Sequence, residues 1–549
     1  MSQNRLLAVL LGVLAALVLV VGGLSAVLLL GGKGDDSGGD GTTTAGGKSG
    51  GGGGDAKGVL RLPGTDPVTL DPHIAGDATS AEYIVEIFSG LVTLSPKLDI
   101  EMDLAEKVDI SPDGKQYTFT LRDNAAFHSG RKVTATDIKY SIERASSKEL
   151  SSPTAIAYLG DIVGVREHFA GVAKDVKGVE VIDDRHVRIT IDAAKPYFMA
   201  KLTYPTAFVV DKSQIESNAR NWSRKPNGTG PYKLAEWRLG ERIVLEANPK
   251  FHLGAPKLKE ADYLLSGGSA LTRFENNELD VANISLNDID RARDPKSDLN
   301  KVYKASPQFS IAYVAFNTSV PPFDDVAVRR AMGLAIDRKR VAEVTFKNML
   351  QPATGILMPQ LPGYVPEDKT LQYNVEAAKA ELAKSKYAGK MPPIEITEVG
   401  AGAEAGVDTQ AFLEMWKQIG LNITIRQTDF ATFLADQDAG RLQAFNAGWI
   451  MDYPDPEDIL DVKFHSGSPL NDVGYKNPEV DKLLDAARVE ANAAKRLEIY
   501  RQVEKKIVDE AAWLPLYFST THVVVKDSVK NWSEPPMVVP RLRFVELAR

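Results

Sequence analysis

Ile311-Ala-Tyr-Val-Ala-Phe316 is a short apolar stretch, and Val326-Ala-Val-Arg-Arg-Ala-Met-Gly-Leu-Ala-Ile336 follows it along the chain. Branched and aromatic side chains in the first stretch favour a buried β-strand. In the second stretch apolar side chains recur three and four residues apart, which is typical of an α-helix. Strands are likewise expected at 116–121, 187–191 and 243–247, and helices at 375–385, 409–419 and 478–510, the last broken near Asn492. Strands and helices intermixed in this way predict an α/β protein.

The composition is that of a large globular protein. The chain has 549 residues, of which 44% are apolar and 25% charged, which excludes a disordered or collagen-like chain. Roughly 490 residues follow the atypical N-terminal segment, too many for one hydrophobic core, so two or three lobes are expected. With 73 Asp and Glu against 65 Lys and Arg, the net charge of -8 leaves no positive excess for phosphate groups. Nucleic acid is therefore not expected as a partner.

Attachment to a membrane is predicted to come from the N-terminus. The sequence has no cysteine, which excludes disulfides, thiolate chemistry and the lipidated Cys of a bacterial lipoprotein. The run from Leu6 to Leu30 carries no charge, and as a helix it would rise about 37 Å, enough to cross a bilayer. A cleaved signal peptide usually has a shorter apolar stretch, so residues 1–30 are interpreted as a retained transmembrane anchor. Arg5 precedes the run, which places the N-terminus in the cytoplasm and the remaining chain on the extracytoplasmic side.

Residues 31–57 are predicted to be a flexible linker. About half of them are Gly, with Ser, Thr, Asp and Lys between them and no aromatic residue. A Gly-rich chain of this length spans about 30 Å, which would let a tethered domain reach a neighbouring membrane protein.

A search for catalytic and metal-binding motifs is mostly negative. The histidines are scattered, without a pair spaced to bind a metal from one helix face, and no Gly-x-Ser-x-Gly turn raises a serine nucleophile. Gly228-Thr229-Gly230 lacks the third glycine of a dinucleotide loop and is better interpreted as a turn before a strand. We therefore expect no catalytic residue, no metal site and no cofactor.

One acidic segment differs from this background. Gly448-Trp449-Ile450-Met451-Asp452-Tyr453-Pro454-Asp455-Pro456 places Asp452 among apolar and aromatic residues, next to prolines that prevent a helix. A half-buried carboxylate of this kind needs an Arg or Lys partner in the chain, or a cation from a ligand. The alternative is a structural role as a helix cap or turn, which Asp455 also suits.

A series of short motifs follows the linker and spans most of the remaining sequence. They are Leu70-Asp71-Pro72, Ile87-Phe88-Ser89-Gly90-Leu91, Ser111-Pro-Asp-Gly-Lys-Gln-Tyr-Thr-Phe-Thr-Leu-Arg122, Phe127-His-Ser-Gly130, Asn227-Gly-Thr-Gly-Pro-Tyr-Lys-Leu234, Val328-Arg-Arg-Ala331, Ala335-Ile-Asp-Arg338, the Trp449 to Pro456 segment, Asn477-Pro-Glu-Val-Asp481 and Leu514-Pro-Leu-Tyr517. Each motif is weak alone, but in this order they resemble one known family, the extracytoplasmic solute-binding proteins of peptide and nickel ABC importers (bacterial solute-binding protein family 5), of the oligopeptide or dipeptide-binding type.

This resemblance implies a periplasmic-binding-protein-like clamp of two lobes with an extra domain, in which a ligand lies between the lobes. Strands near 306–307 and 513–518 would cross between the lobes as a hinge. The implied domains are discontinuous: domain I at 58–95, 212–305 and 518–549, domain II at 96–211, and domain III at 306–517.

The resemblance also implies a ligand site around Asp452, which matches the Asp that meets the α-ammonium of a bound peptide. Gly448 and Ile450 would offer backbone groups to an extended peptide. Trp449 would pack against a ligand side chain, although a role in the core is nearly as well supported. Ala78, from the loop at 73–79, is the expected contact on the opposite lobe.

The implied function is that of a membrane-anchored receptor and not of an enzyme. A monomer would capture oligopeptides or dipeptides and deliver them to an ABC permease with cytoplasmic ATPases. Two alternatives stay open: a receptor for another small solute, such as a nickel chelate, a sugar or an amine compound, and a surface hydrolase that uses two carboxylates.

Overall fold

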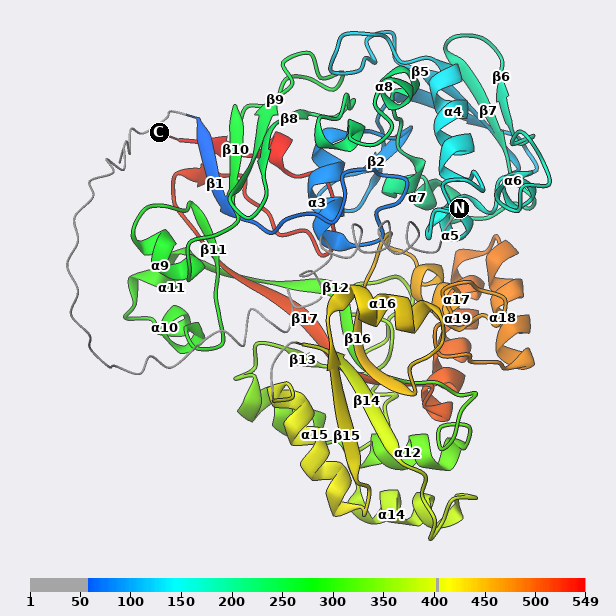
Figure 1. Ribbon diagram of the computed structural model, residues 1–549, viewed down its shortest axis with the longest axis vertical. Coiled ribbons are helices and arrows are strands. Elements are labelled where there is room, and N and C mark those ends of the chain that lie inside the picture. Colours follow the sequence, from blue (N-terminus) through cyan, green and yellow to red (C-terminus); the bar gives the residue numbers. More distant parts are fainter. Residues whose placement is uncertain (1–57, 401–403, 549) are drawn as a thin grey trace, which may run out of the picture.

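The computed structural model describes residues 58–400 and 404–548. The predicted anchor at 1–30 and the predicted linker at 31–57 lie outside the described residues. Within the part of the chain that is described, no helix is long and apolar enough to span a bilayer. Figure 1 shows an upper body that contains both described ends and a lower lobe that contains the middle of the second half of the chain.

The upper body contains two four-stranded sheets. In the first, the strand order is β1-β10-β9-β8, with β1 parallel to β10 and the other pairs antiparallel. The second is antiparallel throughout, in the order β4-β5-β7-β6. The strands are β1 (Val59–Pro63), β4 (Ala105–Ile110), β5 (Gln116–Leu121), β6 (Val179–Val181), β7 (His186–Thr190), β8 (Tyr232–Arg238), β9 (Arg242–Ala247) and β10 (Glu260–Leu264), with the small pairs β2 (Val92–Leu94) with β3 (Ile100–Met102) and β18 (Val529–Lys530) with β19 (Glu546–Leu547).

Helices cover these sheets and enclose two separate cores. One core includes Leu60, Tyr83, Tyr232 and Trp532, and the other includes Phe119, Ile138 and Val187. The helices are α3 (Ala78–Ile87), α4 (Ala135–Ala145), α5 (Ala155–Leu159), α6 (Val165–Phe169), α7 (Phe198–Lys201) and α8 (Lys212–Ser217), with short 3-10 turns at Pro205–Ala207, Trp222–Arg224 and Leu542–Phe544. Three more helices, α9 (Ala270–Glu275), α10 (Ile289–Arg293) and α11 (Asp298–Val302), surround a further core that includes Leu271, Ile289 and Val524.

The lower lobe is built on a seven-stranded sheet. Its strand order is β11-β17-β12-β16-β14-β15, and β13 also pairs with β17. The strands are β11 (Val281–Asn283), β12 (Tyr303–Phe316), β13 (Gln351–Pro352), β14 (Ile394–Val399), β15 (Ile423–Thr428), β16 (Ala444–Ile450) and β17 (Trp513–Val525). The helices are α12 (Val326–Leu334), α13 (Arg338–Arg340), α14 (Val375–Lys384), α15 (Val407–Gln418), α16 (Phe430–Asp438), α17 (Glu457–Phe464), α18 (Pro478–Val489) and α19 (Ala493–Glu510), with a π-helical turn at Val341–Thr345.

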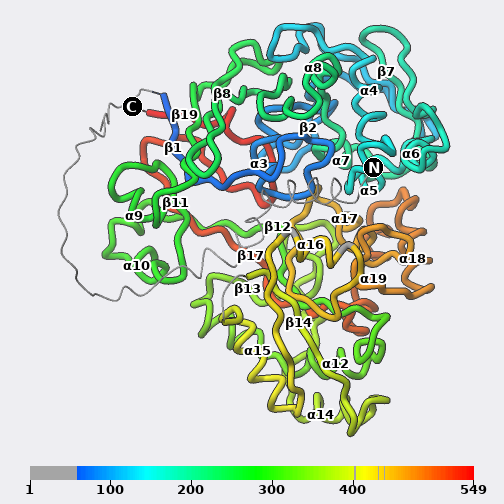
Figure 2. The backbone as a smooth tube through the Cα atoms, in the orientation of Figure 1, coloured from blue at the N-terminus to red at the C-terminus, as the bar shows by residue number. Residues whose placement is uncertain are grey.

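Two long strands join the upper body to the lower lobe. β12 and β17 pair antiparallel from Tyr303 opposite Val524 to Ala315 opposite Trp513, with the register shifted between Pro307 and Ile311. The tube in Figure 2 follows the chain into the lower lobe along β12 and back out along β17. Both segments lie where crossing strands were predicted. The paired strands therefore form a connection between the upper body and the lower lobe.

The Gly228-Thr229-Gly230 turn lies directly against the end of helix α3. The N–H of Gly230 donates to Ile87 O at 2.8 Å, and the Thr229 hydroxyl accepts the N–H of Ser89 at 2.9 Å. A Cβ on Gly228 would lie 2.0 Å from Ile87 O. The turn therefore requires glycine for close backbone approach, and it leads into strand β8 as the sequence predicted.

Gly228→Ala is accordingly expected to destabilise the fold by about 2 kcal/mol or more, because the added methyl group cannot fit without moving α3. The measurement is the melting temperature by circular dichroism. Gly76→Ala is the matched control, since its added Cβ would have Thr154 Cγ2 as nearest neighbour at 3.8 Å. Equal melting temperatures for the two variants would contradict this packing.

Candidate ligand-binding site

Strand β16 carries the first part of the predicted binding motif. Gly448, Trp449 and Ile450 are its last three residues, and one edge of the strand pairs with β12 along its whole length. On the other edge β14 pairs with β16 at Phe445 opposite Thr397, before the motif begins. Within the described ranges, the sheet has no further strand on this second edge beside the motif.

The backbone groups of Gly448 and Ile450 face this second edge. Met451 donates its N–H to a carbonyl of β12 at 2.9 Å, whereas Asp452 directs its N–H the opposite way, to a carboxylate of α17 at 2.8 Å. Because backbone groups of successive strand residues alternate between the two edges, Gly448 and Ile450 point the same way as Asp452. Gly448 is exposed and Ile450 half-buried, so this edge is accessible to another extended chain.

The Asp452 side chain lies at the junction of the two lobes. It is half-buried, and the hydroxyl of Tyr158, from helix α5 in the upper body, donates to its Oδ2 atom. The Tyr158 ring stacks on Tyr204 at 3.8 Å and meets Tyr453 edge-on at 6.1 Å. Burial raises the pKa of Asp452 to about 7, and the hydrogen bond from Tyr158 opposes this rise.

Two further carboxylates lie near the same tyrosines. Asp458 is fully buried; burial and the neighbouring charge of Asp452 hold its pKa well above the usual range. Asp77, the N-cap of α3, accepts the N–H of Ser80 at 2.8 Å, and burial raises its pKa as well. Besides burial, the charges of all three carboxylates raise the pKa of Tyr204. The junction therefore gathers acidic groups from both lobes around one aromatic cluster.

The basic side chains near the motif are already engaged. Arg496 pairs with Asp455 at 2.6 Å, and Arg488 pairs with Asp461 at 2.7 Å. Lys201 pairs with Glu457 and Asp161, at 3.0 and 3.1 Å. Asp452, Asp458 and Asp77 form no ion pair with a Lys, Arg or His among the residues that are described. The site thus gathers carboxyl groups that have no basic partner, and a cationic group from outside the chain can pair with them.

Trp449 lies at the margin of the lower core. It is half-buried, packs against that core, and has Lys463 Nζ 5.0 Å from the centre of its ring. Lys463 is itself paired with Asp472 at 2.7 Å. Packing against the core explains why the Trp449 side chain is partly buried. A contact between Trp449 and a ligand stays a prediction.

Ala78 is the first residue of α3 and is half-buried. The loop before it lies beside the start of α5, because a Cβ built on Gly76 would be 3.8 Å from Thr154, the N-cap of α5. Tyr158 lies on that helix. Ala78 is therefore on the upper side of the junction, where the sequence analysis placed it, and its contact with a ligand stays a prediction.

Sequence reasoning placed the loop at 73–79, which contains Asp77, on the upper side of the site, but it missed Tyr158, Tyr204 and Lys201. Tyr158 and Asp452 are 294 positions apart, and Tyr204 and Lys201 are likewise far from the motif along the chain. Nothing in the local pattern around Tyr158 distinguishes it from a core tyrosine. From the residue types alone, the acidic motif gave the signal for this site, because a carboxylate in an apolar stretch requires a partner; the loop at 73–79 came from the family resemblance.

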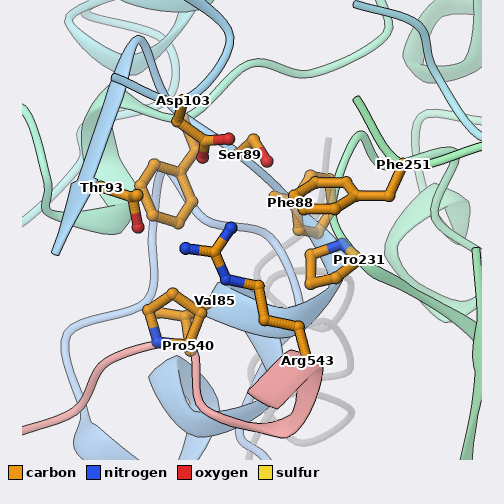
Figure 3. A pocket seen from close by; sticks show the side chains of 10 residues that line it. Val85, Phe88, Ser89, Thr93, Asp103, Pro231, Phe251, Pro540 and Arg543 are labelled. Carbon is orange, nitrogen blue, oxygen red and sulfur yellow. The ribbon is translucent and has the colours of Figure 1, made fainter. Parts of the chain in front are cut away.

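Another hollow lies in the upper body, away from Asp452. Figure 3 shows the guanidinium group of Arg543 pointing into it, with Asp103 and Ser89 on the far wall. Asp103 is held by His252 Nε2 at 2.6 Å, so the hollow combines opposite charges that belong to the protein itself. Over the described residues, no group of three or more His, Cys, Asp or Glu is arranged to hold a metal ion.

The arrangement of two lobes joined by two crossing strands, with an acidic group at their junction, defines a periplasmic-binding-protein-like clamp. The sequence model of the bacterial extracellular solute-binding proteins, family 5 (middle region), matches residues 99–471, more than half of the chain. The chain therefore belongs to this family, which confirms the resemblance found in the sequence and the α/β, two-lobed fold that it implied.

Similar proteins agree with this assignment. The oligopeptide-binding protein OppA of Bacillus subtilis is 27% identical over 85% of this chain and 88% of its own length. Heme-binding protein A of Haemophilus influenzae is also 27% identical, over 86% of this chain and 88% of its own.

Two structures of the murein tripeptide binding protein MppA were also compared. One, of the Escherichia coli protein, superposes with a TM-score of 0.79 at 26% identity over 89% of this chain and 98% of that chain. The other, an unliganded open form, gives 0.68 at 27% identity, over 90% of this chain and 98% of that chain.

Asp452→Asn is expected to stabilise the unliganded protein at alkaline pH. The native pKa of about 7 lies above the ordinary value of 3.8, so between these values the folded protein binds more protons than the unfolded chain. Stability conferred by this group therefore falls as the pH rises toward 7. Asparagine removes that loss and still accepts the Tyr158 hydroxyl.

Melting temperatures at about pH 5 and about pH 8 test this linkage. The variant should melt several degrees above the wild type at the higher pH and show a smaller difference at the lower one. The same difference at both values would show that Asp452 does not titrate in this range.

Proposed function

We propose that the chain captures oligopeptides or dipeptides between its lobes and delivers them to an ABC permease driven by cytoplasmic ATPases. The observation that carries this proposal is the half-buried Asp452 carboxylate, whose described neighbours include no basic partner. A peptide α-ammonium supplies the opposite charge and three hydrogen-bond donors. The names of the relatives, oligopeptide-binding and murein tripeptide binding, support the same class of ligand.

Recognition of the rest of the ligand is proposed to use the backbone. An extended peptide lying along the second edge of β16 would pair with the N–H and C=O groups of Gly448 and Ile450. Backbone pairing does not depend on side-chain identity, so many sequences could bind. Trp449 would provide a flat wall for one side chain, and Ala78 a contact from the upper body.

A receptor for another small solute is the second candidate. The heme-binding relative favours it, because its sequence identity to this chain is the same as that of the oligopeptide-binding relative. The same clamp can serve different ligands, since fold does not determine substrate. The surface hydrolase gains no support from the family, which is one of solute-binding proteins. We propose that the chain is not an enzyme.

The decisive experiment compares peptides that differ only at the amino terminus. Thermal shift of the full chain is measured with a pool of random di- to pentapeptides and with the same pool after N-acetylation. The free-amine pool should stabilise the wild type, by about 2.7 kcal/mol at 100 times the dissociation constant, and the acetylated pool should have little effect. Asp452→Asn should lose the difference between the pools.

Asp455→Asn is the matched control for this experiment. It removes the ion pair with Arg496, so its baseline melting temperature should fall, but it should keep the preference for free amines. Stabilisation of the wild type by neither pool, or by both equally, would overturn the role assigned to Asp452.

The same proposal places the protein on the extracytoplasmic face of the membrane, as a monomer. Residues 1–30 would form a single-pass anchor and residues 31–57 a tether. The uncharged run from Leu6 to Leu30 supports the anchor. In membrane fractionation, the full chain should sediment with membranes and a variant lacking residues 1–57 should be released. Release of both forms would contradict the anchor.

A further inference from the structure

A buried ion pair joins the two lobes beside Asp452 without belonging to the predicted ligand contacts. Lys201 is the last residue of α7 in the upper body, and Glu457 is the first residue of α17 in the lower lobe. Lys201 Nζ lies 3.0 Å from Glu457 Oε1, and both side chains are only 4% exposed. Figure 1 places α7 and α17 on facing sides of the junction between the lobes.

Each partner has a second contact within its own lobe. Lys201 Nζ also lies 3.1 Å from Asp161 Oδ2, and Asp161 is further paired with Lys195 at 2.6 Å. Glu457 accepts the hydroxyl of Tyr453. Both groups can therefore separate without either losing every partner, as a contact that forms and breaks with lobe movement requires.

Each partner of this pair offsets part of the cost of burying the charge of the other. Burial opposes the charged form of Lys201, but the charges of Glu457 and Asp161 outweigh it and keep the pKa of Lys201 above its usual value. Burial raises the pKa of Glu457 to about 7, and the charge of Lys201 limits that rise. When the lobes separate, the attraction between these two charges is lost, while Lys201 keeps Asp161 as a partner.

We propose that Lys201 and Glu457 form the closure contact of this clamp, an ion pair that raises the affinity for a ligand by stabilising the closed arrangement of the lobes. Neither residue touches the ligand in this account; both act as positioning residues. A ligand that binds only the closed arrangement gains apparent affinity in proportion to the closed fraction. The comparison with MppA agrees, because the superposition on its unliganded open form is the poorer of the two.

The contact also fits the position of the acidic motif. Glu457 follows Asp452 by five positions, and the intervening Tyr453 contacts both the Tyr158 ring and the Glu457 carboxylate. Closing the Lys201 contact therefore also brings Tyr158 of the upper body to Asp452 of the lower lobe, across the junction. The part of this inference that concerns affinity rests on the proposed function, whereas the part that concerns closure does not.

Glu457→Gln tests the proposal with little change of shape. Lys201 keeps Asp161 as a partner in this variant, so the upper body should fold normally. Small-angle X-ray scattering of the unliganded full chain should show a larger radius of gyration than for the wild type. The dissociation constant for the free-amine peptide pool should rise about tenfold.

Two further variants separate closure from general stability. Lys369→Met breaks a buried ion pair within the lower lobe, between Lys369 and Glu504 at 3.0 Å, and should lower the melting temperature without changing the scattering. The double variant that combines Lys201→Met with Glu457→Gln completes a double-mutant cycle. Its loss of binding free energy should be smaller than the sum of the losses in the two single variants.

Unchanged scattering and unchanged affinity in Glu457→Gln would overturn the closure contact. Failure of the wild type to bind the peptide pool would instead count against the proposed function, and the scattering of the unliganded variants would still decide whether the pair closes the lobes.

Discussion

The proposed ligand site depends on one carboxylate, Asp452, which has no basic partner among the described residues. Asp452 is held in an aromatic junction where burial raises its pKa to about 7, and the nearby basic side chains are engaged by other acids. A buried charge is costly unless it is paired, so a fold that retains one gains from a cationic ligand. The proposed site draws on both lobes: Tyr158 and Asp77 come from the upper body, and Asp452 from the lower lobe.

The sheet connects the segment that carries Asp452 to the two strands that cross between the lobes. β12 pairs with β16 on one side and with β17 on the other, so the strand that bears the motif is attached to the two strands that cross between the lobes. Under the proposed function, movement of the lobes would change the distance between Asp452 and the upper body. An edge of β16 left unpaired beside the motif adds backbone groups to the single charge, which together favour a ligand with an amine and an extended backbone.

The sequence predicted elements wherever side-chain periodicity reflects burial. The helix at 478–510 breaks at Asn492 as expected, because its side chain caps α19 by accepting the N–H of Lys495 at 3.0 Å. Strand β12, by contrast, begins at Tyr303 and not at Ile311, since its first half pairs with β17 but is partly exposed and shows no apolar pattern. Asp452 could be identified because a carboxylate within an apolar stretch is visible in the local sequence. Tyr158 and Lys201 depend on contacts between distant segments, which no local pattern encodes.

Native mass spectrometry of the full chain, purified without denaturation, tests the central claim most directly when the released compounds are then identified. The account predicts a heterogeneous set of short peptides with free amino termini, because one ammonium and the backbone would provide most of the recognition. A single non-peptide compound, or peptides with blocked amino termini, would contradict the pairing of Asp452 with a ligand amine.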